Sequence, residues 1–136
     1  MRQKPIIELA RTELVTRNQH ASIAAIAKSM IENTVGSVFL VDDEEKVCGM
    51  ITDKAIFALI ADGKNPLEMQ PVEMMEEIRT VKRNTDALDV LEMMEANELS
   101  RVGIISEKGK IIGVVSRKKL KFEKLRILKD ELGIRA

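Results

Sequence analysis

The chain of 136 residues has no tryptophan, no tyrosine and only three phenylalanines. Proteins that stack the bases of single-stranded nucleic acids need aromatic side chains, so this mode of binding is disfavoured. Lysine plus arginine and aspartate plus glutamate both number 22, so the chain also lacks the basic excess of a dedicated nucleic-acid binder. We therefore regard nucleic acid as an unlikely partner.

Cysteine and histidine are equally scarce, with Cys48 and His20 as the single examples. One cysteine cannot form an internal disulfide, and its position in an apolar run predicts a small core residue. A histidine without a second histidine or a cysteine at ligand spacing does not predict a metal site. Glycine-rich phosphate loops and Ser/His/Asp or Cys/His sets are also missing, so we expect no enzyme and no catalytic residue.

Long hydrophobic runs are missing as well. No apolar run approaches the roughly 18 to 20 residues needed to cross a bilayer. The basic start at residues 1–5 is followed by Glu8, Arg11 and Glu13, a pattern that does not predict a signal peptide. We expect a cytoplasmic protein with no membrane segment.

What the sequence does contain is an internal repeat. Residues 38–56 return as residues 102–120 at a constant offset, so that Gly49 coincides with Gly113 and Thr52 with Ser116. A copy of roughly sixty residues would be only marginally stable alone, because a short chain buries a small fraction of its surface. We therefore expect two repeats, residues 1–68 and residues 69–136 with a C-terminal helix, that together form one compact module.

Each copy reads as helix, strand, turn, strand, helix. Ser22 and Asp86 are good N-caps for the first helix of each copy, and apolar residues recur after them at helical spacing. Gly109 suits the positive φ of the second turn. The predicted strands are residues 37–41, 47–51, 102–105 and 111–115, and a long charged helix is predicted over residues 117–132.

The segments that precede the two copies also match. Pro5 and Pro71 can each begin a short helix. Residues 15–18 resemble residues 81–84 at the same 66-residue spacing as the two prolines. We expect two extra residues near Gln19 and His20 to absorb the change to the 64-residue offset downstream.

This pattern resembles the tandem cystathionine-β-synthase domain pair, the CBS pair, from Pro5 to about Leu128. The resemblance rests on the order of elements, the repeat length, the apolar strand before an acidic turn, and Gly-x-x-Thr/Ser at a strand-to-helix junction, each found twice. It implies an α/β (α+β) fold of two pseudo-twofold half-units, each a small mixed β-sheet with two helices, packed sheet to sheet. It also implies a homodimer.

The resemblance further implies a stand-alone regulatory sensor. Such modules bind an adenine nucleotide (AMP, ADP or ATP) or an S-adenosylmethionine-type ligand in the cleft between the repeats, and they modulate a partner protein. A hydroxyl at Thr52 or Ser116 can cap the following helix, whose free N–H groups also form an anion site. In the family this hydroxyl faces the sugar and phosphate of the ligand.

The chain departs from the family at the aspartate that grips the ribose. The corresponding residues are Ala55 in the first copy and Lys119 in the second. A charge-assisted hydrogen bond contributes about 1.5 to 3 kcal/mol, so this loss weakens nucleoside binding by about tenfold or more at each site.

The second copy concentrates positive charge instead. Arg117, Lys118 and Lys119 fill the first turn of the last helix, where cations oppose the helix dipole. Arg101 lies at the start of a strand, where the family often has an arginine that touches phosphate. We predict a site centred on Arg101, Ser116 and Lys119 for a strongly anionic ligand such as a nucleotide polyphosphate.

Two alternatives to this site stay open. The basic helix end can be solvated and form salt bridges with acids such as Glu123 or Glu107, or Lys119 can occupy its own cleft. The first copy has Ser37 in place of Arg101 and Asp53 in place of Arg117, so we expect it to bind anions less well. The full set of candidate ligand-binding residues is Arg101, Val102, Ser116, Arg117, Lys119, Thr16, Ser37, Val38, Thr52 and Asp53.

Two functions of other classes compete with the sensor. One is a ligand-free scaffold for dimerisation or protein interaction, which the two missing aspartates favour. The other, less favoured, is a nucleic-acid-associated regulator that uses the basic residues of the last helix.

Overall fold

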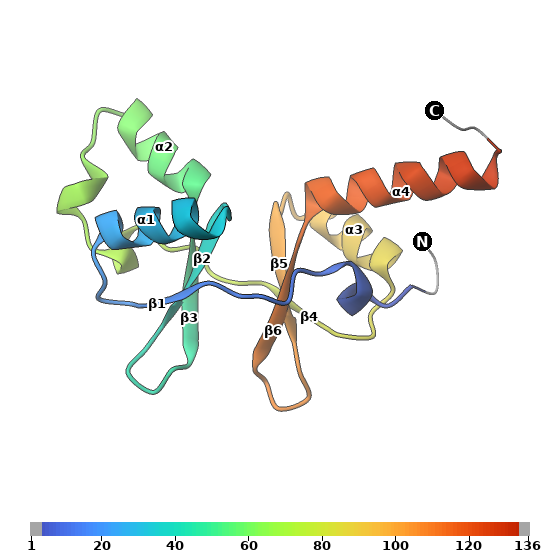
Figure 1. Cartoon of the computed structure of the whole chain (residues 1–136), viewed down its shortest axis with the longest axis horizontal. Helices are drawn as coiled ribbons and strands as arrows, with labels where there is room; N and C mark the ends of the chain where they lie inside the picture. The colour runs from blue at the N-terminus through green and yellow to red at the C-terminus, as the bar shows by residue number, and fades with distance from the viewer. Residues whose placement is uncertain (1–3, 134–136) are drawn as a thin grey trace. The chain divides into compact units, whose positions relative to one another are not determined.

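The computed structural model describes residues 4–133 and divides the chain into two compact units (Figure 1). The N-terminal unit consists of residues 14–78. The C-terminal unit consists of residues 79–133 together with residues 4–13, which we call the first lead-in segment. Each unit is a three-stranded mixed sheet with two α-helices, which confirms the predicted α+β class.

In the N-terminal unit, β1 (Thr16–Asn18) runs parallel to β2 (Ser37–Val41), and β2 pairs antiparallel with β3 (Val47–Thr52). The helices are α1 (Ile23–Asn33) and α2 (Asp53–Ala61), followed by the short 3-10 helices η2 (Pro66–Glu68) and η3 (Pro71–Glu73). The residues after η2 and through Ile78 form the second lead-in segment, residues 69–78. The buried core comprises Ile23, Ile26, Met30, Val38, Leu40 and Ile51.

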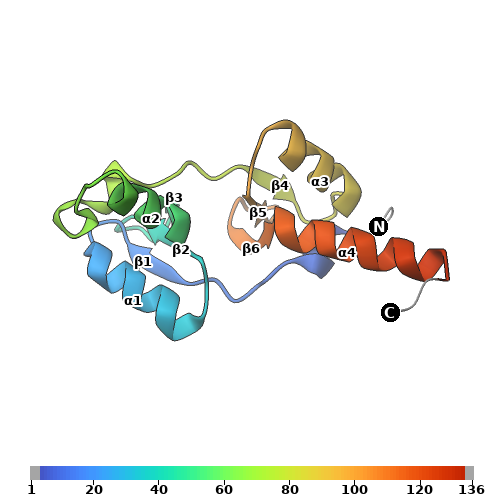
Figure 2. The same cartoon turned by 90° about the horizontal axis from the view of Figure 1, so that it is seen from above.

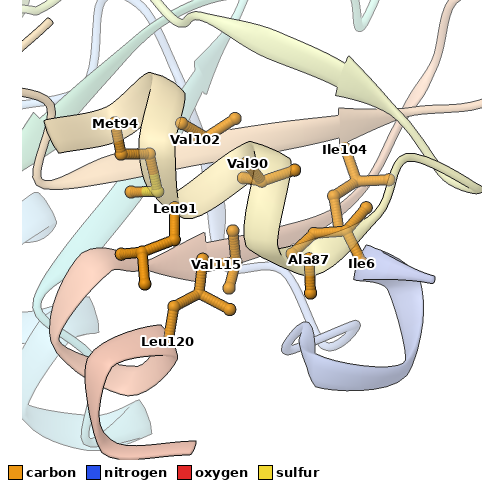
Figure 3. Close-up of a cluster of buried hydrophobic side chains, with 9 residues drawn as sticks. All are labelled: Ile6, Ala87, Val90, Leu91, Met94, Val102, Ile104, Val115 and Leu120. Carbon is orange, nitrogen blue, oxygen red and sulfur yellow. The ribbon is translucent and has the colours of Figure 1, made fainter. Parts of the chain in front are cut away.

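The C-terminal unit repeats this order with the 3-10 helix η1 (Ile6–Leu9) in front. It has β4 (Thr80–Lys82) parallel to β5 (Arg101–Ile105), and β5 antiparallel to β6 (Ile111–Ser116). Helices α3 (Ala87–Ala96) and α4 (Arg117–Glu131) lie side by side (Figure 2). Figure 3 shows the core, in which Ile6 of η1 packs with Ala87, Val90, Leu91, Met94, Val102, Ile104, Val115 and Leu120.

Local chemistry at the helix and turn ends explains the element boundaries. The side-chain oxygens of Ser22 and Asp86 accept backbone N–H groups of the first turns of α1 and α3, as N-caps do. The β2–β3 and β5–β6 turns both require one left-handed residue, which is Gly109 (φ +78°) in the second and Glu45 (φ +63°) in the first. Gly133 likewise follows α4 with φ +72°.

Each lead-in segment packs on the sheet of the other repeat. Arg11 pairs with Val114 on β6 through two backbone hydrogen bonds of 2.9 and 3.0 Å, and Glu76 pairs with Met50 on β3 in the same way. The repeated glycines lie beneath these segments. A Cβ at Gly113 would lie 3.2 Å from the Cβ of Ala10, so the glycine lets the lead-in segment approach closely.

Three expectations from the sequence were wrong in detail. Thr16 pairs with Phe39 and Thr80 with Gly103, so the strands keep the 64-residue offset, and the two extra residues lie before Thr16 rather than near Gln19 and His20. Cys48 is exposed, and it has no cross-strand partner because the register between β2 and β3 shifts at this point. Ile31, at helical spacing with the core of α1, is 80% exposed.

The boundary between the two sequence repeats at residue 68 stays a prediction. The compact units do not follow this boundary, because residues 4–13 pack with residues 79–133, and residues 69–78 pack with residues 14–68. Within residues 4–133, no helix combines the length and the apolarity that a membrane crossing requires.

Candidate functional site

The strongest candidate site lies where β5 begins and β6 ends in the C-terminal unit. Arg101, the first residue of β5, is the cross-strand partner of Ser116, the last residue of β6. The Ser116 hydroxyl accepts the backbone N–H of Lys119 at 3.1 Å, and the backbone N–H of Arg117 donates to the carbonyl of Ser100 at 2.9 Å. The predicted residues Arg101, Ser116, Arg117 and Lys119 are therefore brought together at one end of the sheet.

The two sides of this sheet have different roles. Val102 and Val115 are buried in the core beneath α3 and α4. Because side chains alternate along a strand, Arg101 and Ser116 lie on the opposite face. Val102, which was a candidate ligand-binding residue, has its side chain in the core rather than on the face that carries Arg101.

Arg11 is a member of this face that the sequence reasoning missed. It pairs with Val114, two residues before Ser116, so Arg11, Val114, Ser116 and Arg101 share one face of the sheet. Partial burial and, secondarily, the positive charge of Arg101 lower the pKa of the Arg11 guanidinium. The only signal in the sequence was the repeat alignment, which placed residues 4–13 with the first copy.

Lys119 is paired along its own helix. Its Nζ lies 3.9 Å from Glu123 Oε1, and its side chain is 55% exposed. Glu123 is buried and accepts from Arg126 Nη2 at 2.9 Å and Nε at 3.2 Å. The first alternative from the sequence expected the basic end of the helix to form a salt bridge with Glu123. Lys119 forms this salt bridge.

Hydrogen bonding by Arg126 is the main reason why the pKa of Glu123 lies below its ordinary value. Burial opposes this effect, while the charges of Arg126, Lys119 and Lys4 add to it. Glu123 therefore stays ionised and holds several cations near the start of α4.

The N-terminal unit has a counterpart with the same backbone geometry. Ser37 opens β2 opposite Thr52 at the end of β3, and the Thr52 hydroxyl accepts the backbone N–H of Ala55 at 3.2 Å. The Asp53 N–H donates to the Gly36 carbonyl at 3.0 Å. Both Ser37 and Thr52 are buried, at 1% and 3% exposure, so a ligand has less access to these hydroxyls than to Ser116.

The other predicted residues of this unit are divided between two faces. Thr16 pairs with Phe39 and shares the face of Ser37, whereas Val38 points into the helix-covered core. The lead-in residue at the position of Arg11 is Glu76. The N-terminal counterpart thus has Glu76 and Asp53 where the C-terminal site has Arg11 and Arg117, and Ser37 where it has Arg101.

The groups gathered at the C-terminal site are suited to binding an anion. A hydroxyl, backbone N–H groups at the start of α4 and several cations favour an anion. Among residues 4–133, no three His, Cys, Asp or Glu side chains are close enough to share a metal ion. Cys48 is a poor nucleophile, because partial desolvation of this largely exposed thiol and, secondarily, the nearby Asp42 raise its pKa.

Comparison with known proteins agrees with the repeat. The family model described as CBS domain matches residues 6–62 and again residues 70–125. An uncharacterized protein of Methanopyrus kandleri is 28% identical over 118 residues, which are 85% of this chain and 60% of that protein. The chain therefore spans less than two thirds of this relative.

Solved structures share the fold. A CBS domain protein from Pyrobaculum aerophilum complexed with AMP superposes with a TM-score of 0.79 at 21% identity, covering 95% of this chain and 97% of that one. A CBS domain pair in complex with 5′-methylthioadenosine and S-adenosyl-L-methionine gives a TM-score of 0.78 at 19% identity, covering 90% and 97%.

Proposed function

Because the chain belongs to the CBS domain family, with two copies of the domain, we propose that it is a non-enzymatic regulatory module. In this proposal it binds an adenine nucleotide or a related adenosyl ligand. Ligand binding then changes the geometry of a homodimer and thereby modulates a partner protein. Such a signal requires a ligand with different affinities for two states of the module.

The observation that carries the proposal is the junction of Arg101, Ser116 and the first turn of α4. It offers a hydroxyl, helix N–H groups and cations within one unit. The two solved structures described above hold AMP and adenosyl compounds, which supports this ligand class. Ala55 and Lys119 replace the family's ribose-binding aspartate, so we expect contacts to phosphate, rather than to ribose, to dominate the affinity.

A thermal-shift screen at low salt tests the proposal, with AMP, ADP, ATP, NAD, S-adenosylmethionine and methylthioadenosine as ligands. A ligand present at 100 times its Kd should add about 2.7 kcal/mol of stability, which raises Tm by several degrees for a domain of this size. We expect the largest shift with ATP, and we expect Arg101→Ala and Lys119→Ala each to abolish it.

The controls separate the site from the function. If the Tm shift survives both substitutions, the protein binds nucleotides but not at this site. If Tm is unchanged with every compound, the proposed nucleotide-binding function is wrong.

A ligand-free interaction scaffold is the second candidate, because of the apolar surface of α4. Its residues Phe122, Leu125 and Leu128 are 63%, 54% and 42% exposed, although large apolar side chains are usually buried. Sedimentation equilibrium of the wild type and of Phe122→Ser tests this function. A dimer that is lost in the variant, together with no response to any nucleotide, would favour the scaffold.

A further inference from the structure

The equivalent faces of the two units carry charges of opposite sign. In the C-terminal unit, Arg11, Arg101 and the first turn of α4 (residues 117–119) supply five cations. The same positions in the N-terminal unit are Glu76, Ser37 and residues 53–55, which supply two acids and one lysine. The two units share the same backbone arrangement, so the difference in charge comes only from the side chains at the equivalent positions.

Backbone pairing places the two arginines on one surface. Arg11 and Val114 are hydrogen-bonded partners, Val114 and Ser116 are alternate residues of β6, and Ser116 is opposite Arg101. Each of these relations keeps side chains on the same face of a sheet. Arg11 and Arg101 therefore flank β6, two strand spacings or about 10 Å apart and offset by two residues along the strand, and two long side chains can reach across β6 from either side to a common ligand.

Because like charges repel each other, the positive charge of Arg101 contributes to the lowered pKa of Arg11. The approach of Arg101 disfavours the charged form of Arg11, in addition to the effect of partial burial. Among the ion pairs of residues 4–133, Arg101, Arg117 and Lys118 have no acidic partner within 4.0 Å. A ligand with several negative charges would relieve this concentration of positive charge.

We infer that the C-terminal unit binds the phosphate chain of a polyphosphate ligand, with Arg11 and Arg101 on either side of it, and that the N-terminal counterpart does not bind polyanions. This inference rests on the proposed function and narrows it to one polyphosphate per chain. Arg11 becomes a ligand-binding residue, supplied by the first lead-in segment, which belongs to the first repeat in sequence but packs in the C-terminal unit. Planar guanidinium groups suit phosphate because each can donate two parallel hydrogen bonds.

The chemistry is shared by a nucleoside triphosphate and by inorganic tripolyphosphate, so both serve as probes, with AMP as a ligand of low charge. The experiment is isothermal titration calorimetry of the full chain at low salt. We expect one site per chain for ATP and for tripolyphosphate. We expect Arg11→Gln to weaken both by about tenfold, the loss of one charge-assisted contact, and to weaken AMP binding much less.

The matched control is Arg83→Gln. Arg83 is exposed in the same unit just after β4, at the opposite end of the sheet from Arg101, because β4 and β5 are parallel. The Arg83→Gln substitution removes the same charge, and we expect it to change the affinity for ATP and for tripolyphosphate by less than about twofold. Arg11→Lys, which keeps the charge but loses the planar donor set, should recover only part of the affinity. An unchanged Tm of the unliganded Arg11→Gln protein checks that the variant is folded.

The outcomes distinguish this inference from the proposed function. If ATP binds and Arg11→Gln behaves like Arg83→Gln, or if two polyphosphates bind per chain, the inference is wrong and the nucleotide-binding module stands. If tripolyphosphate binds as tightly as ATP, the polyanion site stands and the preference for adenine nucleotides fails. If neither probe nor AMP binds, both fail.

Discussion

Glu45 has a backbone conformation that disfavours any side chain. Its φ of +63° is matched in the second repeat by Gly109 at +78°. A non-glycine residue in the left-handed region costs roughly 1 to 2 kcal/mol, part of which glycine gives back through its entropy. We therefore expect Glu45→Gly to raise the free energy of unfolding by about 0.5 to 1 kcal/mol in urea titrations, and Gly109→Glu to lower it. A reduced stability of Glu45→Gly would contradict this account.

Glu123 makes the stability of the C-terminal unit depend on pH. Its pKa in the folded state is lowered from an ordinary value of 4.5, chiefly by Arg126. The stabilisation by the carboxylate is therefore fully present above about pH 4.5 and is lost as the pH falls through the lower folded-state pKa. We expect Glu123→Gln to be less stable than the wild type at pH 7, and the difference between the urea midpoints to shrink at pH 3. A difference of the same size at both pH values would exclude this role.

At the scale of elements, the glycines beneath the lead-in segments differ in how much crowding they can accept. A Cβ at Gly113 meets the Cβ of Ala10 at 3.2 Å and the backbone oxygen of Arg11 at 3.4 Å, whereas at Gly49 the three nearest atoms all belong to the side chain of Met75, with its Sδ at 2.5 Å and its Cβ at 3.2 Å. We expect Gly113→Val to cost about 1 to 3 kcal/mol and Gly49→Val to cost less, because the thioether can move aside. Amide exchange should show lost protection around Arg11 in the first variant. Equal costs would mean that the lead-in segment does not set the requirement.

Strands, helices and caps were predictable because their signals are local. Asp86, Thr52 and Ser116 cap helices as their positions indicate, and α4 ends within one residue of its predicted end. The pairing of the lead-in segments was not predictable from local signals, since Arg11 pairs with Val114, 103 positions later, and Glu76 pairs with Met50, 26 positions earlier. The candidate site was predictable to the same extent. Arg101, Ser116 and Lys119 are close together because of one hairpin, whereas Arg11 reaches them only through a long-range contact.

At the scale of the whole molecule, the chain passes from one unit to the other twice, after Glu13 and after Ile78. Ile6 is fully buried in the C-terminal core although it belongs to the start of the chain. We expect Ile6→Ala to destabilise the C-terminal unit by about 2 to 5 kcal/mol. Amide exchange at Val90 and Leu91 should accelerate much more than at Ile26 of the other unit. Similar acceleration at both places would mean that the units unfold together.

The crossed packing of the lead-in segments has a consequence for the order in which the protein folds during synthesis. Residues 14–78 contain their whole sheet, both helices and the segment that pairs with β3, so they can fold as soon as they have left the ribosome. Residues 4–13 emerge before them, but the partners of this segment lie at Arg83 and Thr85, in α3 and on β6, all of which are made later. The first part of the chain to be synthesised is therefore among the last to pack, and Ile6 stays exposed to water until the C-terminal unit has been made.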